Sequence, residues 1–149
     1  MDDLRDLYQE VILDHNRSPR NRRPMEGATH RAHGHNPLCG DQLVVQLKVE
    51  EGRLVDVAFE GDGCAISTAS ASLMTEGVRG RDEVTVRDMH EQFHRLVTTG
   101  EADAVVLGKL SALAGVAEYP ARVKCASLAW HTLVAALDRR VDAAVSTEG

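Results

Sequence analysis

Residues 43–59 read LVVQLKVEEGRLVDVAF, and this stretch decides the fold. Apolar residues recur at every second position on both sides of the Glu51-Gly52 pair. They are Leu43, Val45, Leu47 and Val49 before the pair, and Val55, Val57 and Phe59 after it. Alternation with a period of two indicates β-strands, and the Glu-Gly pair indicates a turn between them. The stretch therefore predicts an antiparallel β-hairpin.

The chain before this hairpin predicts one helix and one further strand. Apolar side chains at helical spacing over residues 4–12 indicate an amphipathic helix, which we expect to end within the Arg- and Pro-rich residues 16–24. Residues 29–35 are the candidate for a third strand, although their alternation is poor. Together with the hairpin, these segments predict a sheet of about three strands.

The chain after the hairpin is mostly helix-compatible. The expected helical segments are residues 64–78, 85–99, 104–113 and 122–140. Thr85 with Asp88 three residues later resembles a capping box, and Gly100 should end that helix. Trp130 is expected to anchor the core from the last helix. Beyond Val141 the tail is small and polar and is expected to be frayed.

Composition narrows the class of protein. With 149 residues and 43% hydrophobic content, we expect one domain spanning residues 1–149. A net charge of -6 and an aromatic fraction of 3% argue against nucleic-acid binding, which needs positive charge and stacking platforms. No apolar run has signal-peptide or membrane-spanning character. Three widely spaced cysteines fit a reducing compartment, so we expect a cytoplasmic protein without a membrane partner.

Each of the three cysteines lies next to a structure breaker or near an expected helix start. Their contexts are NPLCGD at residues 36–41, GDGC at 61–64 and PARVKC at 120–125. Backbone N–H groups at a helix start stabilise a thiolate, and Arg122 and Lys124 add positive charge beside Cys125. Easily ionised thiols of this kind favour metal or sulfur chemistry.

A tetrahedral zinc site could be completed by the three cysteines and one carboxylate. The carboxylate is that of Asp41, two residues after Cys39, and the other thiolates are those of Cys64 and Cys125. Spacing alone leaves open that the cysteines are three small buried hydrophobic residues, because the chain contains no CxxC pair.

Four motifs in order resemble the NifU/IscU family of iron-sulfur cluster assembly proteins, and in particular its SufU branch. The motifs are VILDHNRSPRNRR at residues 11–23, NPLCGD at 36–41, GDGCAISTASASLM at 61–74 and YPARVKCASLAW at 119–130. The resemblance runs from Leu4 to about Leu137. It implies a small α+β domain, in which an antiparallel sheet of about three strands is packed by several α-helices and the cysteines converge at one exposed end.

Two departures from the IscU type favour the SufU branch. Lys124 stands where the IscU type has a histidine, and residues 119–124 lack its double proline. Residues 100–114 are also extra sequence of the length seen in the SufU branch. The resemblance implies a zinc-bound sulfur acceptor for a pyridoxal-phosphate cysteine desulfurase of the SufS-like kind, which passes sulfur to a downstream iron-sulfur scaffold.

The same resemblance implies roles for individual residues. Cys39 would accept persulfide sulfur, and zinc would be held by Cys39 together with Asp41, Cys64 and Cys125. Arg122 and Lys124 could stabilise the anionic persulfide or could be plain helix-surface charge. The basic run over residues 17–23 could dock a partner or lie in a solvated loop. Oligomeric state and the downstream sulfur acceptor are left open.

Two other functions remain open at this point. The same four residues, Cys39, Asp41, Cys64 and Cys125, could hold a [2Fe-2S] cluster and make the protein a scaffold. Separately, His90, Glu91 and His94 match the HExxH motif of zinc hydrolases on an expected helix. Against a hydrolase, the apolar face of that helix leaves the two histidines at its margin, and the sequence identifies no third ligand.

Overall fold

The computed structural model describes residues 2–37, 40–138 and 144–146. In chain order, the elements are α1 (Asp2–Arg17), β1 (His30–Asn36), β2 (Asp41–Glu50), β3 (Arg53–Asp62), α2 (Ala65–Val78), α3 (Glu83–Thr99), α4 (Ala104–Leu107), the 3-10 helix η1 (Gly108–Glu118), α5 (Pro120–Asp138) and β4 (Ala144–Ser146). None of the described helices is long and apolar enough to cross a lipid bilayer. The predicted α+β fold class is confirmed.

The sheet has the strand order β3-β2-β1-β4. Strands β1, β2 and β3 pair antiparallel, so the predicted hairpin and the predicted third strand are both confirmed. Glu51 and Gly52 form the hairpin turn with φ values of 52° and 76°, a left-handed conformation that glycine adopts readily. The register shifts between Lys48 and Val49, which is an irregularity of the kind a β-bulge produces.

That irregularity changes one face of the second hairpin strand. Leu54 is fully buried, whereas Val55, which the alternation assigned to the same face as Val57 and Phe59, is 38% exposed. A bulge adds a residue to one strand and thereby reverses the inside-outside order beyond it. The predicted hairpin is therefore correct, but Leu54 replaces Val55 as its buried residue near the turn.

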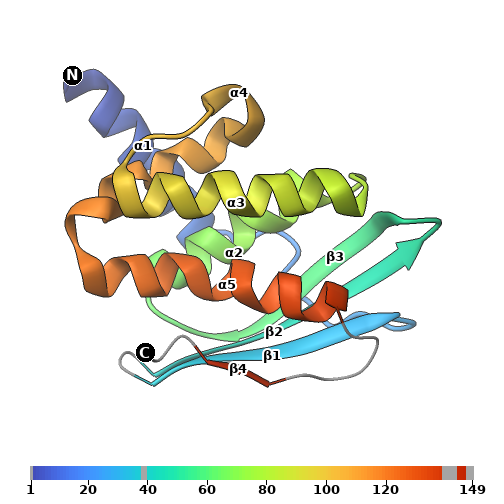
Figure 1. The fold of residues 1–149 in the computed structure, drawn as a ribbon. Coiled ribbons are helices and arrows are strands. Elements are labelled where there is room, and N and C mark those ends of the chain that lie inside the picture. Colours follow the sequence, from blue (N-terminus) through green and yellow to red (C-terminus); the bar gives the residue numbers. More distant parts are fainter. Residues whose placement is uncertain (1, 38–39, 139–143, 147–149) are drawn as a thin grey trace.

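The helices gather on one side of the sheet (Figure 1). Helix α5 packs on β1 and β2, and α2 packs on β3 and on α5. Helices α1, α3 and η1 cover α2 and α5 from outside. On β1, burial alternates along the strand, so His33 and His35 point to the uncovered face of the sheet. A two-layer α+β arrangement results.

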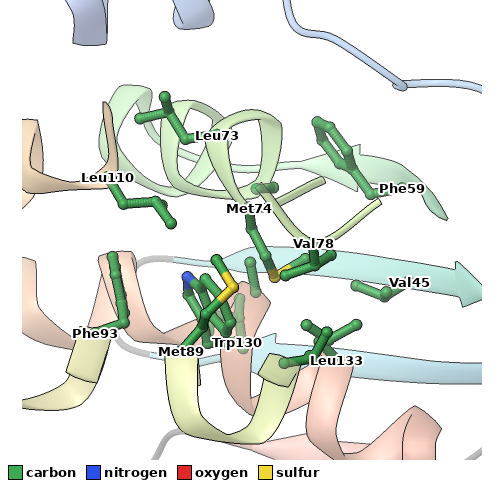
Figure 2. Packing of buried hydrophobic residues seen from close by; sticks show 14 of the residues in the cluster. Val45, Phe59, Leu73, Met74, Val78, Met89, Phe93, Leu110, Trp130 and Leu133 are labelled. Atoms are coloured by element: carbon green, nitrogen blue, oxygen red, sulfur yellow. The ribbon is translucent and has the colours of Figure 1, made fainter. Parts of the chain in front are cut away.

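The core is mainly aliphatic and is centred on the buried Trp130, as the sequence predicts. Side chains from α2, α3, α5 and the sheet converge around Trp130 (Figure 2). Its indole ring stacks on Phe93 of α3, with ring centroids 5.2 Å apart. Aromatic pairs in this arrangement add about 1 kcal/mol beyond their buried area. The helix that carries Cys125 is therefore held firmly against the rest of the molecule.

Helix α3 begins earlier than the sequence analysis placed it. It starts at Glu83, and its cap is Asp82, whose Oδ1 accepts a hydrogen bond of 2.7 Å from the Thr85 backbone N–H. The capping box assigned to Thr85 and Asp88 was wrong, because the acceptor lies on Asp82 and Thr85 is the donor. Gly100 ends the helix with a φ of 82°, as predicted.

Two other segments differ from expectation. The helix predicted over residues 104–113 is only a single α-turn, α4. The chain continues as the 3-10 helix η1, which begins at Gly108 with a φ of 55°. In the tail, Ala144–Ser146 form strand β4 and pair in parallel with β1, where fraying was expected. The remaining tail residues lie outside the described ranges.

Candidate metal centre

Three of the four predicted metal ligands meet at one end of the sheet. Asp41 is the first residue of β2, Cys64 directly precedes α2, and Cys125 lies in the second turn of α5. One donor atom from each of the three side chains lies within 4.8 Å of the other two. Cys39, the fourth predicted ligand, lies outside the described residues.

The approach to Cys64 depends on the glycines before it. Gly61 has a φ of 128°, and a Cβ there would lie 2.1 Å from the carbonyl oxygen of Gln42. Only glycine adopts this conformation so close to a neighbouring strand. A Cβ on Gly63 would lie 2.9 Å from Ser67 Oγ and 3.2 Å from Asp41 Oδ1. The two glycines thus let the turn bring Cys64 directly against Asp41.

Cys64 is the N-cap residue of α2. Its Sγ accepts a hydrogen bond of 3.4 Å from the Ser67 backbone N–H. Free N–H groups and the helix dipole make the start of a helix favourable for a negative charge. The sulfur of the half-buried Cys64 therefore faces the free N–H groups at the start of α2.

Asp41 is almost fully buried and is oriented by Cys64. Its Oδ1 accepts a hydrogen bond of 2.8 Å from the Cys64 backbone N–H, and its Oδ2 lies 3.9 Å from the Cys64 thiol. The exposed fraction of Asp41 is 1%. A carboxylate is rarely buried without a compensating partner, so the position favours a ligand role.

Cys125 is held by the last residue of β1. The exposed fractions of Cys125 and Asn36 are 2% and 0%, and the Asn36 side-chain N–H group donates to Cys125 Sγ over 3.9 Å. Such a donor orients the sulfur and stabilises its negative charge. Asn36 was not singled out from the sequence, although it stands three residues before Cys39 in the NPLCGD motif.

The donor set fits a tetrahedral metal. Two thiolates and one carboxylate supply three of the four positions that zinc normally takes, and thiolates also hold iron in iron-sulfur clusters. Asp41 and Cys125 are buried, and Cys64 is half-buried. The described residues therefore fit either zinc or a cluster, provided that a fourth ligand is supplied.

The two predicted auxiliary cations lie at the start of α5. Arg122 is exposed and Lys124 is partly exposed. In the described part of the chain, neither side chain makes an ion pair or a hydrogen bond. Both remain available for a partner or a substrate.

The basic run over residues 17–23 is tied to the body of the protein. Arg22 donates a hydrogen bond of 2.8 Å to the carbonyl oxygen of Gly61, Arg20 pairs with Asp14, and Arg23 pairs with Asp56. The Arg20 backbone N–H donates to the buried Ser72 Oγ, which also bonds the buried His15 ring. These bonds fasten the segment beside the Gly61–Gly63 turn, a supporting role that the sequence did not reveal.

The HExxH motif lies elsewhere, on α3. Its His90 ring lies 5.6 Å from the His131 ring of α5 and 6.3 Å from Trp130, measured between centroids. Burial, followed by the neighbouring His131, His94 and Arg87, lowers the pKa of His90 to about 4. Burial likewise lowers the pKa of His131.

The fold thus places a third histidine beside the motif, which the sequence could not locate. Glu91 and His94 are exposed. Among the described residues, the group of three with donor atoms within 4.8 Å is Asp41, Cys64 and Cys125, and the histidines do not form a second one. As built, the motif lacks the convergent geometry of a zinc hydrolase.

Comparison with known proteins agrees with the fold and with the cysteine motifs. Residues 7–126 match the model of the NifU-like N-terminal domain, so the chain belongs to the NifU-like family. The family predicted from the motifs is confirmed.

Two relatives illustrate the range of the family. The chain is 40% identical over 128 residues to the zinc-dependent sulfurtransferase SufU of Bacillus subtilis, covering 85% of this chain and 86% of that protein. It is 38% identical over 141 residues to the iron-sulfur cluster assembly scaffold protein IscU of Streptococcus pyogenes, covering 94% and 88%.

A solved structure gives the same fold. It is a candidate iron-sulfur cluster assembly scaffold protein of the SUF system from Fervidobacterium islandicum. The two structures superpose with a TM-score of 0.82 at 35% identity, covering 86% of this chain and 94% of the other. The predicted NifU/IscU-like architecture is confirmed.

Proposed function

We propose that this protein is a zinc-dependent sulfur carrier for iron-sulfur cluster assembly. It accepts persulfide sulfur on Cys39 from a pyridoxal-phosphate cysteine desulfurase of the SufS-like kind and passes it to a downstream scaffold. Zinc is held by Cys39, Asp41, Cys64 and Cys125. The observation that carries the proposal is the convergence of Asp41, Cys64 and Cys125, with donor atoms within 4.8 Å of one another.

Two features of the chain support this chemistry. Zinc, when bound, keeps a ligating thiol deprotonated at neutral pH. The Ser67 N–H at the start of α2 and the Asn36 amide point hydrogen-bond donors at the sulfurs of Cys64 and Cys125. Cys39 stands two residues before Asp41 in the sequence.

The transfer step is a thiolate exchange. The Cys39 thiolate attacks the outer sulfur of the desulfurase persulfide, a new S–S bond forms, and the desulfurase cysteine leaves as a thiolate. No electrons enter or leave overall. Arg122 and Lys124, at the start of the helix that carries Cys125, would stabilise the new anionic persulfide.

A cluster scaffold is the second candidate. The relatives include IscU scaffold proteins at comparable identity, and the same donor set could hold a [2Fe-2S] unit. Metal analysis and an absorbance spectrum of freshly purified protein separate the two. Colourless protein with about one zinc per chain supports the carrier, and brown protein with iron and acid-labile sulfide supports the scaffold.

The carrier mechanism is tested with Cys39→Ala. The variant should lose the ability to stimulate a cysteine desulfurase, because no thiolate remains to take the sulfur, while the other three ligands keep part of the zinc. Ser127→Ala, which removes a buried hydroxyl two residues after Cys125 in α5, is the control and should stimulate normally. Full stimulation by Cys39→Ala would rule out the relay.

A further inference from the structure

Ser67 carries a buried hydroxyl that has no hydrogen-bond partner. Its exposed fraction is 0%, and its Oγ makes no hydrogen bond in the described part of the chain. Buried polar groups nearly always have a hydrogen-bond partner. An unpaired buried hydroxyl next to the metal centre therefore requires a physical explanation. Trp130 and Ser111 hold the other unpaired buried side-chain atoms among the described residues.

The position of Ser67 in α2 suggests what the hydroxyl is for. Cys64 is the N-cap, so Ser67 is the third helical residue, the position from which a Glu or Gln side chain accepts the N–H of the cap residue in a capping box. One half of that reciprocal arrangement is present, because the Ser67 N–H donates to Cys64 Sγ. The other half is missing, because Asp41 Oδ1 already accepts the Cys64 N–H at 2.8 Å.

The two competing acceptors both lie close to Gly63. The position of a Cβ on this glycine would be 2.9 Å from Ser67 Oγ and 3.2 Å from Asp41 Oδ1. The hydroxyl is therefore close to the place that Asp41 now fills. If the Asp41 carboxylate turned away, the Cys64 N–H would lose its acceptor unless Ser67 replaced it.

We propose that Ser67 is the alternate cap of helix α2, accepting the Cys64 N–H when Asp41 leaves it to bind the metal. This inference rests on the metal site proposed above. It gives Asp41 two positions, one capping the helix in the metal-free protein and one on the metal. Ser67 is then a positioning residue. With it, the Cys64 N–H has a hydrogen-bond acceptor whichever of the two positions Asp41 takes.

The capping role is tested by a double-mutant cycle on metal-free protein. Ser67→Ala should leave the thermal midpoint of the wild type unchanged or slightly raised, because its hydroxyl has no bond to lose there. In an Asp41→Ala background, where Ser67 has become the cap, the same change should lower the midpoint by about 3 °C. Ser111→Ala removes another unpaired buried hydroxyl and should act equally in both backgrounds.

A second background guards against an unfolded Asp41→Ala variant. Asp41→Asn keeps an oxygen that can accept the Cys64 N–H, so Ser67→Ala should behave there as it does in the wild type. Equal effects of Ser67→Ala in the Asp41→Ala and wild-type backgrounds would overturn the alternate cap.

The metal role is tested by zinc affinity, measured by competition with a chromophoric chelator. Ser67→Ala should weaken zinc binding about tenfold, while Ser111→Ala should not change it. Unchanged affinity in Ser67→Ala would mean that Asp41 serves the helix and the metal at once, and would overturn the inference. If the wild type bound no zinc, the proposed function would fail, and the metal-free cycle would still decide whether Ser67 caps the helix.

Discussion

The cysteine centre (Asp41, Cys64, Cys125) and the histidine cluster (His90, His94, His131) are both groups of metal-binding residue types, but their geometries differ. In the first, the donor atoms lie within 4.8 Å of one another, whereas the described histidines form no such group. The two cysteine sulfurs are oriented by neighbours, Cys64 Sγ by the Ser67 N–H and Cys125 Sγ by the Asn36 amide. The His90 ring instead stacks on Trp130 at the edge of the core.

A match to a metal-binding sequence motif does not by itself bring donor atoms together into a metal site. HExxH is the sharper pattern, because two histidines one turn apart share a helix face. The cysteine centre contains no CxxC pair, yet its donors come from three elements that the fold brings to one point. Hydrogen bonds that fix the donors distinguish a prepared site from a chance cluster.

The largest effect we expect is the loss of bound zinc from variants of the cysteine centre and not from variants of the histidine cluster. Cys64→Ala should remove nearly all bound zinc, because it deletes one of the three converging donors. His90→Ala should keep about one zinc per chain. Metal analysis of both purified variants decides between the groups. If Cys64→Ala kept its zinc and His90→Ala lost it, the result would support a zinc hydrolase instead.

The dependence of the free energy of unfolding on pH tests the environment of the histidine cluster. The pKa of His90 is about 4 in the folded protein, so between pH 6.5 and 4 the unfolded chain binds a proton that the folded chain does not. Stability should therefore fall as the pH drops through this window, with His90 contributing on the order of 1 to 2 kcal/mol between pH 7 and 5. The lowered pKa values of His15 and His131 act in the same direction.

Urea unfolding of metal-free protein at pH 7 and pH 5 measures this loss. His90→Gln should flatten the difference, because glutamine does not titrate. His35→Gln, on the uncovered face of β1, is the control and should keep the wild-type difference. An unchanged pH dependence in His90→Gln would mean that folding does not lower the pKa of His90.

The smallest expected effect concerns the turn that supports the cysteine centre. Gly63→Ala would press a methyl group against Ser67 Oγ at 2.9 Å and Asp41 Oδ1 at 3.2 Å, so zinc affinity should fall about tenfold. Gly115→Ala is the matched control, because a Cβ there meets nothing within 4 Å. The same chelator competition measures both, and equal affinities would show that the centre tolerates a displaced Asp41.

Local rules predicted most elements and failed at identifiable places. Alternation located the hairpin, but the irregularity at Lys48 and Val49 exchanged Leu54 for Val55 at the buried face. Capping preference located α3 but selected Thr85 over Asp82, since both are good cap residues and only the structure shows which side chain accepts. Such errors are expected where two neighbouring residues satisfy the same rule.

The sequence by itself determined the hairpin, the helices, the family and the residue types of the metal centre. These depend on short-range periodicity and on motifs that are contiguous in the chain. Only the tertiary structure decided that Asp41 meets Cys64 across 23 residues, that Asn36 reaches Cys125 across 89, and that the buried Ser67 hydroxyl is left unpaired. Contacts at such separations depend on how whole elements pack, which no local pattern encodes.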